Sequence, residues 1–337
     1  MDSFARYLPA LESEMRRAVA SGTVSPGLLY GMIRYHMGWV DAEFLPTQIN
    51  GGKQLRPVLL LLSCETVGGD WRKALPAAAA VELFHNFSLV HDDIEDHDPM
   101  RRERPTLWTL WGEAQAINAG DALFALSYRA LARLRETGLE PEQVLAIQNR
   151  FNETVIQLTE GQCMDISFET QKTVTESDYL QMVGGKTAVL TGLACELGSM
   201  AAAAQLTQTK AFQEFGYNLG MSFQMQDDLL GMWGDPAQIG KPVGSDLQKH
   251  KKTLPIIHGL THSEPFRALF ARTEFSEADI AQAQVLLEEA GSRTYTETRV
   301  SDYHQRALSA LERIDAVVRE AKEALVDLTQ RLLNRKK

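Results

Sequence analysis

The sequence has few cysteines, few strand signals and no long apolar run. Its three cysteines, Cys64, Cys163 and Cys195, form no C-x-x-C pair, so we expect small buried apolar residues in a reducing compartment. The longest purely aliphatic run, Val58 to Leu62, is far too short to cross a bilayer. The first twenty residues mix acids and bases with apolar residues and resemble neither a signal peptide nor a transit peptide. We therefore expect a cytoplasmic protein with no transmembrane segment.

Basic residues are outnumbered by acidic ones, 34 to 44, which gives a formal net charge of -10 over 337 residues. A surface of this sign repels nucleic acid, so we expect no nucleic-acid partner, and any phosphate ligand must be bound by local cations. The length would permit two domains, but no linker rich in proline, glycine or serine divides the chain. We therefore predict a single domain over residues 1–337.

Helical periodicity dominates the sequence and predicts an all-α fold. Several segments are apolar nearly all round, so we expect central helices ringed by others. Pro57 suits a first helical position, and Thr175-Glu176-Ser177-Asp178 resembles a capping box in front of another helix. The main helices are predicted over Phe4–Val19, Val58–Val67, Leu75–Asp96, Ala119–Thr137, Pro141–Phe168, Leu206–Trp233 and Tyr303–Leu333.

The first of two clusters of paired aspartates ends a largely apolar helical segment. It reads His91-Asp92-Asp93-Ile94-Glu95-Asp96-His97-Asp98 and is followed by Arg101-Arg102. Asp92 and Asp96 lie one turn apart on one helix face, where each can give an oxygen to Mg²⁺ while phosphate oxygens and water complete its shell. Two other interpretations stay open here: a solvated acidic face, and the His-Asp dyad of an HD-type metal phosphohydrolase. An EF-hand does not match, because the glycine that its loop requires is absent.

The second cluster begins 135 residues later, again at the end of an apolar helical segment. It reads Gln226-Asp227-Asp228-Leu229-Leu230-Gly231, and Asp235, Lys241, Asp246 and Lys251 follow. Glycines and prolines between residues 234 and 244 predict a defined loop. Negative charge at the inner end of a buried helix is unfavourable unless a cation binds there. We therefore predict a divalent metal that holds a polyphosphate between two facing helices.

A diphosphate also needs direct cationic donors, and several short motifs provide them. Arginine offers a rigid fork to phosphate oxygens, and lysine offers a point charge. The segment Gly51-Gly52-Lys53-Gln54-Leu55-Arg56-Pro57 leads into a helix start, whose backbone N–H groups favour an anion. Taken singly, Lys241 and Lys251 fit ordinary surface lysines as well. The candidates are Lys53, Arg56, Arg101, Arg102, Lys186, Lys241 and Lys251.

In this order and at these spacings, the motifs closely resemble those of the trans-isoprenyl diphosphate synthases, the head-to-tail polyprenyl synthetases, over roughly Gly51 to Pro255. The resemblance implies the all-α isoprenoid-synthase bundle around a deep central cavity, assembled as a homodimer. It also implies a prenyltransferase in which three Mg²⁺ ions link an allylic diphosphate to both aspartate clusters. Mn²⁺ could take the place of Mg²⁺. Isopentenyl diphosphate would occupy a separate cationic site.

The same resemblance implies roles for individual residues. The metal ligands would be Asp92, Asp96 and Asp227, supported by Asp93, Asp228 and Asp246. The allylic diphosphate would be held by Arg101, Lys186 and Lys241. Isopentenyl diphosphate would be held by Lys53, Arg56, His85 and Arg102, with Lys251 as a further substrate-binding residue. Thr187 and Gln224 would lie beside the reacting carbons. Gln162 and Asp165 would belong to a motif that lines the cavity. Two positions depart from the family pattern: Gln54, where a basic residue is common, and Gly231, where a last aspartate is usual.

Product length would be set by Ser88 and Phe87, four and five residues before the first aspartate, which line the cavity floor in this family. One aromatic residue with a small neighbour resembles enzymes that stop near C20, so we predict geranylgeranyl diphosphate, with farnesyl diphosphate or a longer product as alternatives. A class I terpene cyclase would need no second diphosphate site. A non-catalytic subunit of a heteromeric synthase would be expected to lose aspartates, and a head-to-head synthase would lack the G-G-K loop.

Overall fold

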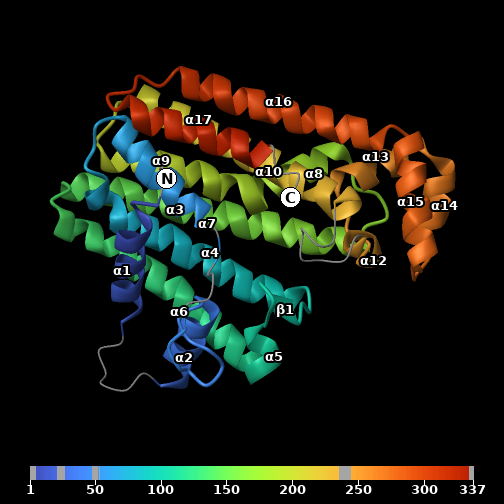
Figure 1. The fold of residues 1–337 in the computed structure, drawn as a ribbon, viewed down its shortest axis with the longest axis horizontal. Coiled ribbons are helices and arrows are strands. Elements are labelled where there is room, and N and C mark those ends of the chain that lie inside the picture. The colour runs from blue at the N-terminus through green and yellow to red at the C-terminus, as the bar shows by residue number, and fades with distance from the viewer. Residues whose placement is uncertain (1–4, 21–26, 48–51, 53, 235–243, 334–337) are drawn as a thin grey trace. The chain divides into compact units, whose positions relative to one another are not determined.

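The computed structural model describes residues 5–20, 27–47, 52, 54–234 and 244–333. Helices dominate these ranges (Figure 1), and the only strands within them are β1 (Met100–Arg101) and β2 (Arg104–Pro105), which pair as an antiparallel hairpin. The predicted all-α fold is therefore confirmed. Nowhere in the described ranges does a helix combine the length and apolarity needed to cross a bilayer.

The chain divides into two compact units. The first contains residues 1–149, 194–205 and 316–324, and the second contains residues 150–193, 206–315 and 325–337. Three of the boundaries fall inside helices, namely α7 (Pro141–Thr170), α9 (Val189–Ala201) and α17 (Arg319–Leu333). The single domain expected from the sequence stays a prediction.

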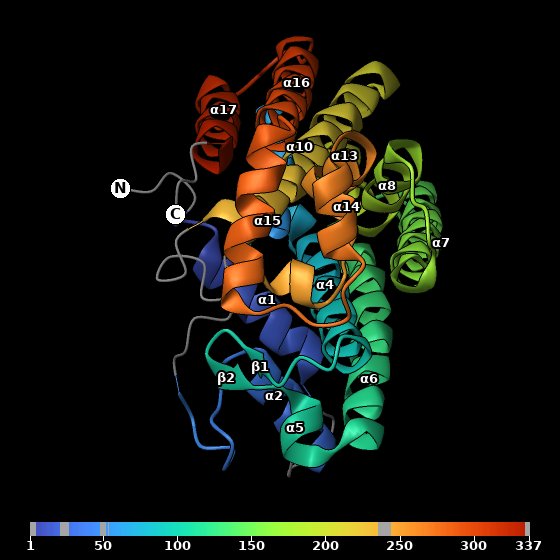
Figure 2. The same ribbon diagram turned by 90° about the vertical axis from the view of Figure 1, so that its right-hand side faces the viewer.

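The first unit is built around α4 (Leu75–Glu95), which is buried on most faces. Its four alanines at 77–80 have no exposed surface, as a central helix requires. Both α6 (Glu113–Ala132) and α1 (Leu8–Val19) pack against it, as Figures 1 and 2 show. The unit also contains α2 (Leu28–His36), α3 (Leu55–Thr66), α5 (Leu107–Trp111) and the 3₁₀ turns η1 (Trp71–Ala74) and η2 (Arg133–Thr137).

The second unit is organised around α10 (Leu206–Trp233), which lies alongside α16 (Ser292–Glu312) in Figure 1. Met221, Met225 and Leu229 of α10 share an apolar cluster with Val300 and Tyr303 of α16. A π-helical turn, η3 (Gly184–Ala188), connects α8 (Glu176–Val183) to α9. This unit also contains α12 (Ser245–Gln248), α13 (Leu254–His262), α14 (Glu264–Phe270) and α15 (Glu277–Glu289).

Most predicted helices exist, with shifts at their ends. The helix predicted over Leu206–Trp233 has those bounds, and the capping box at Thr175 is confirmed. Pro57 is wrongly placed as a first residue, because α3 begins at Leu55. The helix expected over Ala119–Thr137 starts at Glu113 and passes into η2 after Ala132.

The predicted helix over Tyr303–Leu333 is wrong, because α16 ends at Glu312 and α17 begins at Arg319. The N–H groups of Val317 and Val318 both donate to Thr66 O, at 2.8 and 3.1 Å, instead of to carbonyls of their own segment. A tertiary contact thus breaks the helix where no glycine or proline stands. The prediction of buried cysteines holds for Cys64 and Cys195 but is wrong for Cys163, which is exposed.

Candidate active site

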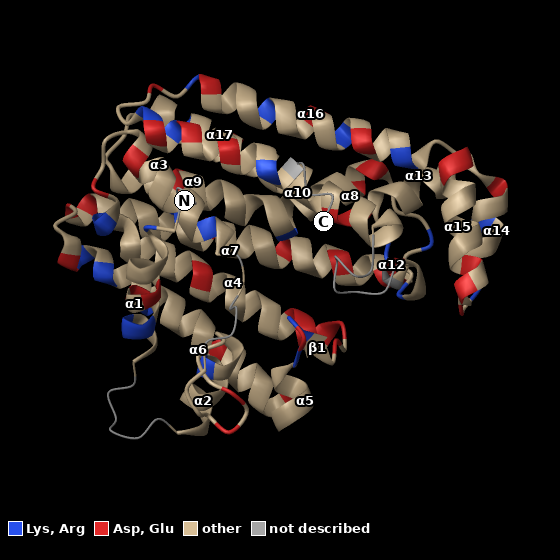
Figure 3. Ribbon diagram, viewed as in Figure 1, with Lys and Arg blue, Asp and Glu red and all other residues tan. Residues whose placement is uncertain are grey.

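The first aspartate cluster occupies the C-terminal end of α4. Asp92 lies in the last turn, and Asp96 is the C-cap residue with near-helical backbone angles. Acidic residues gather where α4 leads toward β1 (Figure 3). The C-terminus of a helix carries partial negative charge, so carboxylates there are unfavourable without a cation. This end of α4 therefore requires cationic partners.

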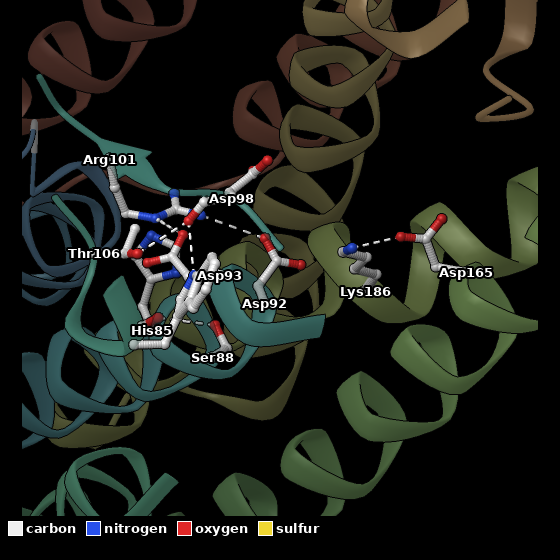
Figure 4. Close-up of polar contacts among 10 residues, drawn as sticks. His85, Ser88, Asp92, Asp93, Asp98, Arg101, Thr106, Asp165 and Lys186 are labelled. Atoms are coloured by element: carbon white, nitrogen blue, oxygen red, sulfur yellow. Dashed lines mark hydrogen bonds and ion pairs between the residues drawn. The ribbon is translucent and has the colours of Figure 1, made fainter. Parts of the chain in front are cut away.

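Arg101 is one such partner. Its Nε donates to Asp93 Oδ1 at 2.6 Å, and its Nη2 lies 3.5 Å from Asp92 Oδ2 (Figure 4). Only 1% of Asp93 is exposed, and burial raises the pKa of its carboxyl to about 6 although the Arg101 charge opposes the rise. Asp93 thus anchors Arg101 inside the fold, whereas the side chain of Asp92 is 22% exposed and can meet a ligand.

The burial of Asp93 argues against a solvated acidic face. The HD-type interpretation also fails on geometry, because a metal dyad needs His91 and Asp92 to face one ion. The His91 ring instead packs against Phe87, with ring centroids 4.8 Å apart, and its Nε2 lies 3.7 Å from Asp121 Oδ1 on α6.

A second group of polar and charged residues includes His85, which precedes Asp92 on α4 by seven residues, and Arg56 on α3. Arg56 Nη1 lies 3.1 Å from His85 Nε2. Burial, and then the charges of Arg56 and Arg102, hold the pKa of His85 well below its usual range, so the imidazole is neutral at neutral pH and its Nε2 can accept from Arg56. Arg102 is half-buried in the same unit. Lys53, predicted to belong with these residues, lies outside the described residues.

Glu82 is a member of this group that the sequence analysis missed. The residue is 2% exposed; burial raises the pKa of its carboxyl, and the charges of Arg56 and Arg102 oppose that rise. Asn86 Nδ2 donates to Glu82 Oε1 at 3.2 Å. One signal was present, since Glu82 is the single acid in the apolar stretch from Val81 to Val90.

The two predicted product-length residues lie between these groups on α4. The Phe87 ring is half-buried and packs against the rings of Phe84 and Phe124, at centroid distances of 5.3 and 5.1 Å. Ser88 Oγ donates to His85 O at 2.8 Å, which turns this small side chain back onto its own helix.

In the second unit, the turn η3 presents Lys186 and Thr187. Lys186 Nζ donates to Asp165 Oδ2 at 2.5 Å (Figure 4). A Cβ on Gly161 would lie 2.2 Å from Lys186 N, so only glycine lets α7 approach η3 this closely. Gln162 is half-buried on the same stretch of α7. π-turns of this kind are frequent at functional sites.

A hydrogen-bond chain then leads to the second aspartate cluster. Thr187 Oγ1 donates to Gln224 Oε1 at 3.1 Å, and Gln224 Nε2 donates to Asp228 Oδ1 at 3.1 Å. Asp228 Oδ2 accepts from Tyr179 OH at 2.6 Å and from Leu254 N at 3.2 Å. Burial raises the pKa of Asp228 to about 7, although the bonds from Tyr179 and Gln224 lower it. No motif in the sequence marks Tyr179 as a member of this chain.

The other predicted residues of this unit surround the end of α10. Asp227 is half-buried, and Lys251 N donates to Asp246 O at 2.8 Å. A Cβ on Gly231 would lie 2.7 Å from Asp246 Oδ2, so the Asp246 carboxylate occupies the space that a side chain at 231 would take. Lys241 and Asp235 lie outside the described residues.

The donor set fits a hard cation. Among the described residues, no three His, Cys, Asp or Glu side chains form a ready-made metal cage. Mg²⁺ does not require one, because it keeps several waters and takes one or two carboxylates together with substrate phosphates. The half-buried Asp92 and Asp96, one turn apart, fit that need in the first unit, and Asp227 fits it in the second.

Comparisons with known proteins agree with this chemistry. Residues 41–288 match the polyprenyl synthetase family. The chain is 41% identical over 287 residues to a geranylgeranyl diphosphate synthase from Mycobacterium tuberculosis, covering 83% of this chain and 80% of that protein. It is 36% identical over 312 residues to a (2E,6E)-farnesyl diphosphate synthase from the same organism, covering 90% and 85%. The crystal structure of a polyprenyl synthetase from Streptomyces coelicolor A3(2) matches with a TM-score of 0.88 at 35% identity, over 97% of this chain and 98% of that one. The chain therefore belongs to the polyprenyl synthetase family of trans-prenyltransferases.

Proposed function

We propose that this protein condenses isopentenyl diphosphate head-to-tail with allylic diphosphates and that its main product is geranylgeranyl diphosphate. The observation that carries the proposal is the Arg101 anchor. Buried Asp93 holds the guanidinium at 2.6 Å and sets it beside Asp92, so a cation stands next to carboxylates of the kind that bind Mg²⁺. A departing diphosphate needs this pairing of metal and direct donor.

We propose that both aspartate clusters hold one magnesium-bound allylic diphosphate. Asp92, Asp96 and Asp227 would ligate Mg²⁺, which supplies charge stabilisation for the leaving diphosphate when bound. The donors to that diphosphate would be Arg101, Lys186 and Lys241. Loss of the diphosphate leaves an allylic cation, which the double bond of isopentenyl diphosphate attacks. The released diphosphate then takes the proton that completes a five-carbon extension.

The second substrate would occupy the cationic group of the first unit. Isopentenyl diphosphate would be bound by Lys53, Arg56, His85 and Arg102, with Lys251 as a further contact. Neutral His85 adds no charge of its own, and its Nε2 lies 3.1 Å from Arg56 Nη1, where it orients that guanidinium. Buried Glu82 balances part of the positive charge before the substrate arrives.

Thr187 and Gln224 would border the reacting carbons. Hydrogen bonds hold these two side chains in place: Thr187 donates to Gln224, Gln224 donates to Asp228, and Tyr179 donates to Asp228. Above the raised pKa of Asp228, about 7, the ionised Oδ1 can only accept. The amide of Gln224 then presents its nitrogen to Asp228 and its oxygen to Thr187, which holds it in one orientation.

One assay tests the proposal. The purified protein is incubated with Mg²⁺, isopentenyl diphosphate and a C5, C10 or C15 allylic diphosphate, and the products are separated by chromatography. The proposal predicts elongation of all three primers to C20. Cyclic hydrocarbons formed without isopentenyl diphosphate would instead identify a terpene cyclase, and no conversion of any primer would leave a non-catalytic subunit.

Three finer points are proposed with the activity: a homodimer, three Mg²⁺ ions per bound allylic diphosphate, and action in the cytoplasm. Light scattering during size-exclusion chromatography tests the first, and metal analysis of a complex with an unreactive allylic diphosphate tests the second. A monomeric mass in the active fraction would refute the homodimer. Fluorescence imaging of a tagged protein tests the third.

A further inference from the structure

The hairpin of β1 and β2 carries both Arg101 and Arg102 and is too short to keep its shape alone. Each strand has two residues, and the turn residues Arg102 and Glu103 have φ values of 52° and 62°. Such angles are uncommon for residues other than glycine, and an isolated two-stranded hairpin is marginal in water. Like charges at 101, 102 and 104 also repel one another. Contacts from outside the hairpin must therefore fix it.

Arg104 provides the main contact. Its Nη1 donates to Tyr35 O at 2.8 Å, and its Nη2 donates to Val40 O at 2.9 Å. Its guanidinium carbon lies 3.8 Å from the centroid of the Tyr35 ring, and Tyr35 OH donates to Pro105 O at 2.9 Å. Tyr35 belongs to the last turn of α2, the end of the helix that carries partial negative charge, and its carbonyl oxygen also accepts from Gly38 N at 2.9 Å. Arg104 thus directs its charge to α2 and not to a substrate.

The segment that receives Arg104 is itself well ordered by hydrogen bonds. The N–H groups of Gly38 and Trp39 close α2 in a Schellman motif, with Gly38 at φ 77°. The loop that follows is joined by a β-bridge between Val40 and Pro46. We call residues 35–46 the α2 buttress. It offers the hairpin a fixed support.

The α2 buttress also lies close to Arg101 and Arg102, the two arginines proposed to bind diphosphate. The hairpin and the α2 buttress line a partly open pocket of about 20 Å³, whose walls include Arg101, Arg102 and Arg104 together with Tyr35 and His36. This volume holds about one water molecule, so the hairpin cannot shift inward far. Arg101 has a second anchor in Asp93 on α4. Arg102 stands at the turn, so its backbone follows the hairpin, and its charge lies near buried Glu82.

We propose that Arg104 and Tyr35 are positioning residues that lock the hairpin to the α2 buttress and so hold Arg102 in place for diphosphate binding. The inference rests on the proposed function, in which Arg102 contacts isopentenyl diphosphate. Neither residue touches substrate. Their loss therefore changes substrate affinity through Arg102 and leaves the reacting groups of the second unit unchanged.

The test replaces Arg104 by methionine, which keeps an unbranched apolar stem but removes the guanidinium and with it both hydrogen bonds. The KM for isopentenyl diphosphate should rise about tenfold, the size expected when a charge-assisted contact is weakened. The KM for the allylic primer should rise less, because Asp93 still holds Arg101, and kcat should stay within about twofold because uniform binding is lost. Arg104→Lys, which reaches one carbonyl, should restore part of the affinity. Tyr35→Phe, which loses one hydrogen bond, should also raise the KM for isopentenyl diphosphate and is less disruptive to folding.

Arg129→Met is the matched control. Arg129 also donates through its guanidinium to two backbone carbonyls, those of Ala18 and Ala20 at the end of α1, but it has no part in the hairpin. Equal KM changes in Arg129→Met and Arg104→Met would overturn the inference, as would unchanged KM values in Arg104→Met. Binding of inorganic pyrophosphate, measured by calorimetry, distinguishes failure of the proposed enzymatic activity from failure of the positioning role of Arg104. A wild-type protein that binds pyrophosphate without elongating any primer refutes the proposed function, and weaker pyrophosphate binding by Arg104→Met alone still supports the positioning role.

Discussion

Replacing Phe87 by alanine should lengthen the main product by one five-carbon unit. The ring is half-buried and packs at its sides against Phe84, Phe124 and His91, as expected of a residue at the floor of a cavity. When the ring is removed, the next aromatic residue along the helix is Phe84, which is fully buried. The prenyl chain would then stop against Phe84.

The size of the effect follows from helix geometry. Three residues of α-helix rise about 4.5 Å. A five-carbon unit adds four bonds of about 1.5 Å to the main chain, or about 5 Å when extended. One unit therefore fits the new depth, and the product should move from C20 to C25. Because Phe87 is only half-buried, the stability cost should be about 2 kcal/mol, below the range for a fully buried ring.

Chromatography of the products formed from a C15 primer and isopentenyl diphosphate measures the change. Ser88→Ala is the matched control at the neighbouring position: it removes one hydroxyl and should leave C20 in place. Phe266→Ala, which removes a fully buried ring from a cluster of the second unit, controls for stability loss. A folded Phe87→Ala variant with the wild-type product distribution would show that Phe87 is not the floor.

Three further changes test other parts of the site. Gly231→Asp should lower kcat/KM on the order of tenfold, because it brings a second carboxylate against Asp246. Gly231→Asn has a similar shape without the charge, so comparing the two variants separates the effect of charge from that of size. Higher activity of Gly231→Asp would contradict the crowding at Asp246. Asp228→Asn should gain stability relative to wild type as the pH rises from about 4 to about 7 in Mg-free buffer. Burial raises the pKa of the wild-type carboxyl to about 7, so the folded state still binds a proton that the unfolded state has already lost. The free energies of unfolding of the two proteins should therefore separate by about 4 kcal/mol between pH 4 and pH 7, and a difference that does not change with pH would contradict this account. Glu82→Gln should destabilise the fold by about 3 kcal/mol in denaturant unfolding, because Arg56 and its neighbours lose a buried counter-charge; an unchanged midpoint would argue that Glu82 is protonated in the native state.

Local patterns predicted the elements that depend on local physics. The apolar periodicity of Leu206–Trp233 gives α10 its observed bounds, and the capping box at Thr175 forms because its bonds join residues three apart. The break between α16 and α17 was not predictable in this way. It depends on Thr66 O, which lies some 250 positions away in the sequence.

The aspartate motif illustrates the same limit inside the site. The sequence marks Asp92 and Asp93 as a pair, but only the structure shows that Asp93 is buried against Arg101 while Asp92 is partly exposed. Arg104 and Tyr35 lie 69 positions apart, and no spacing rule connects them. Residues that contact a ligand can be found from motif chemistry, whereas residues that position them depend on tertiary packing.

The most direct test asks whether both aspartate clusters bind the same magnesium-bound diphosphate. Calorimetry measures the Mg²⁺-dependent affinity of an unreactive thiol analogue of an allylic diphosphate for the wild type, Asp92→Asn, Asp227→Asn and the double variant. Both single variants should bind at least tenfold more weakly, and the double variant should lose much less than the sum of the two free-energy changes, because either substitution already disrupts the shared complex. Wild-type affinity in one single variant, or strictly additive losses, would contradict a shared site.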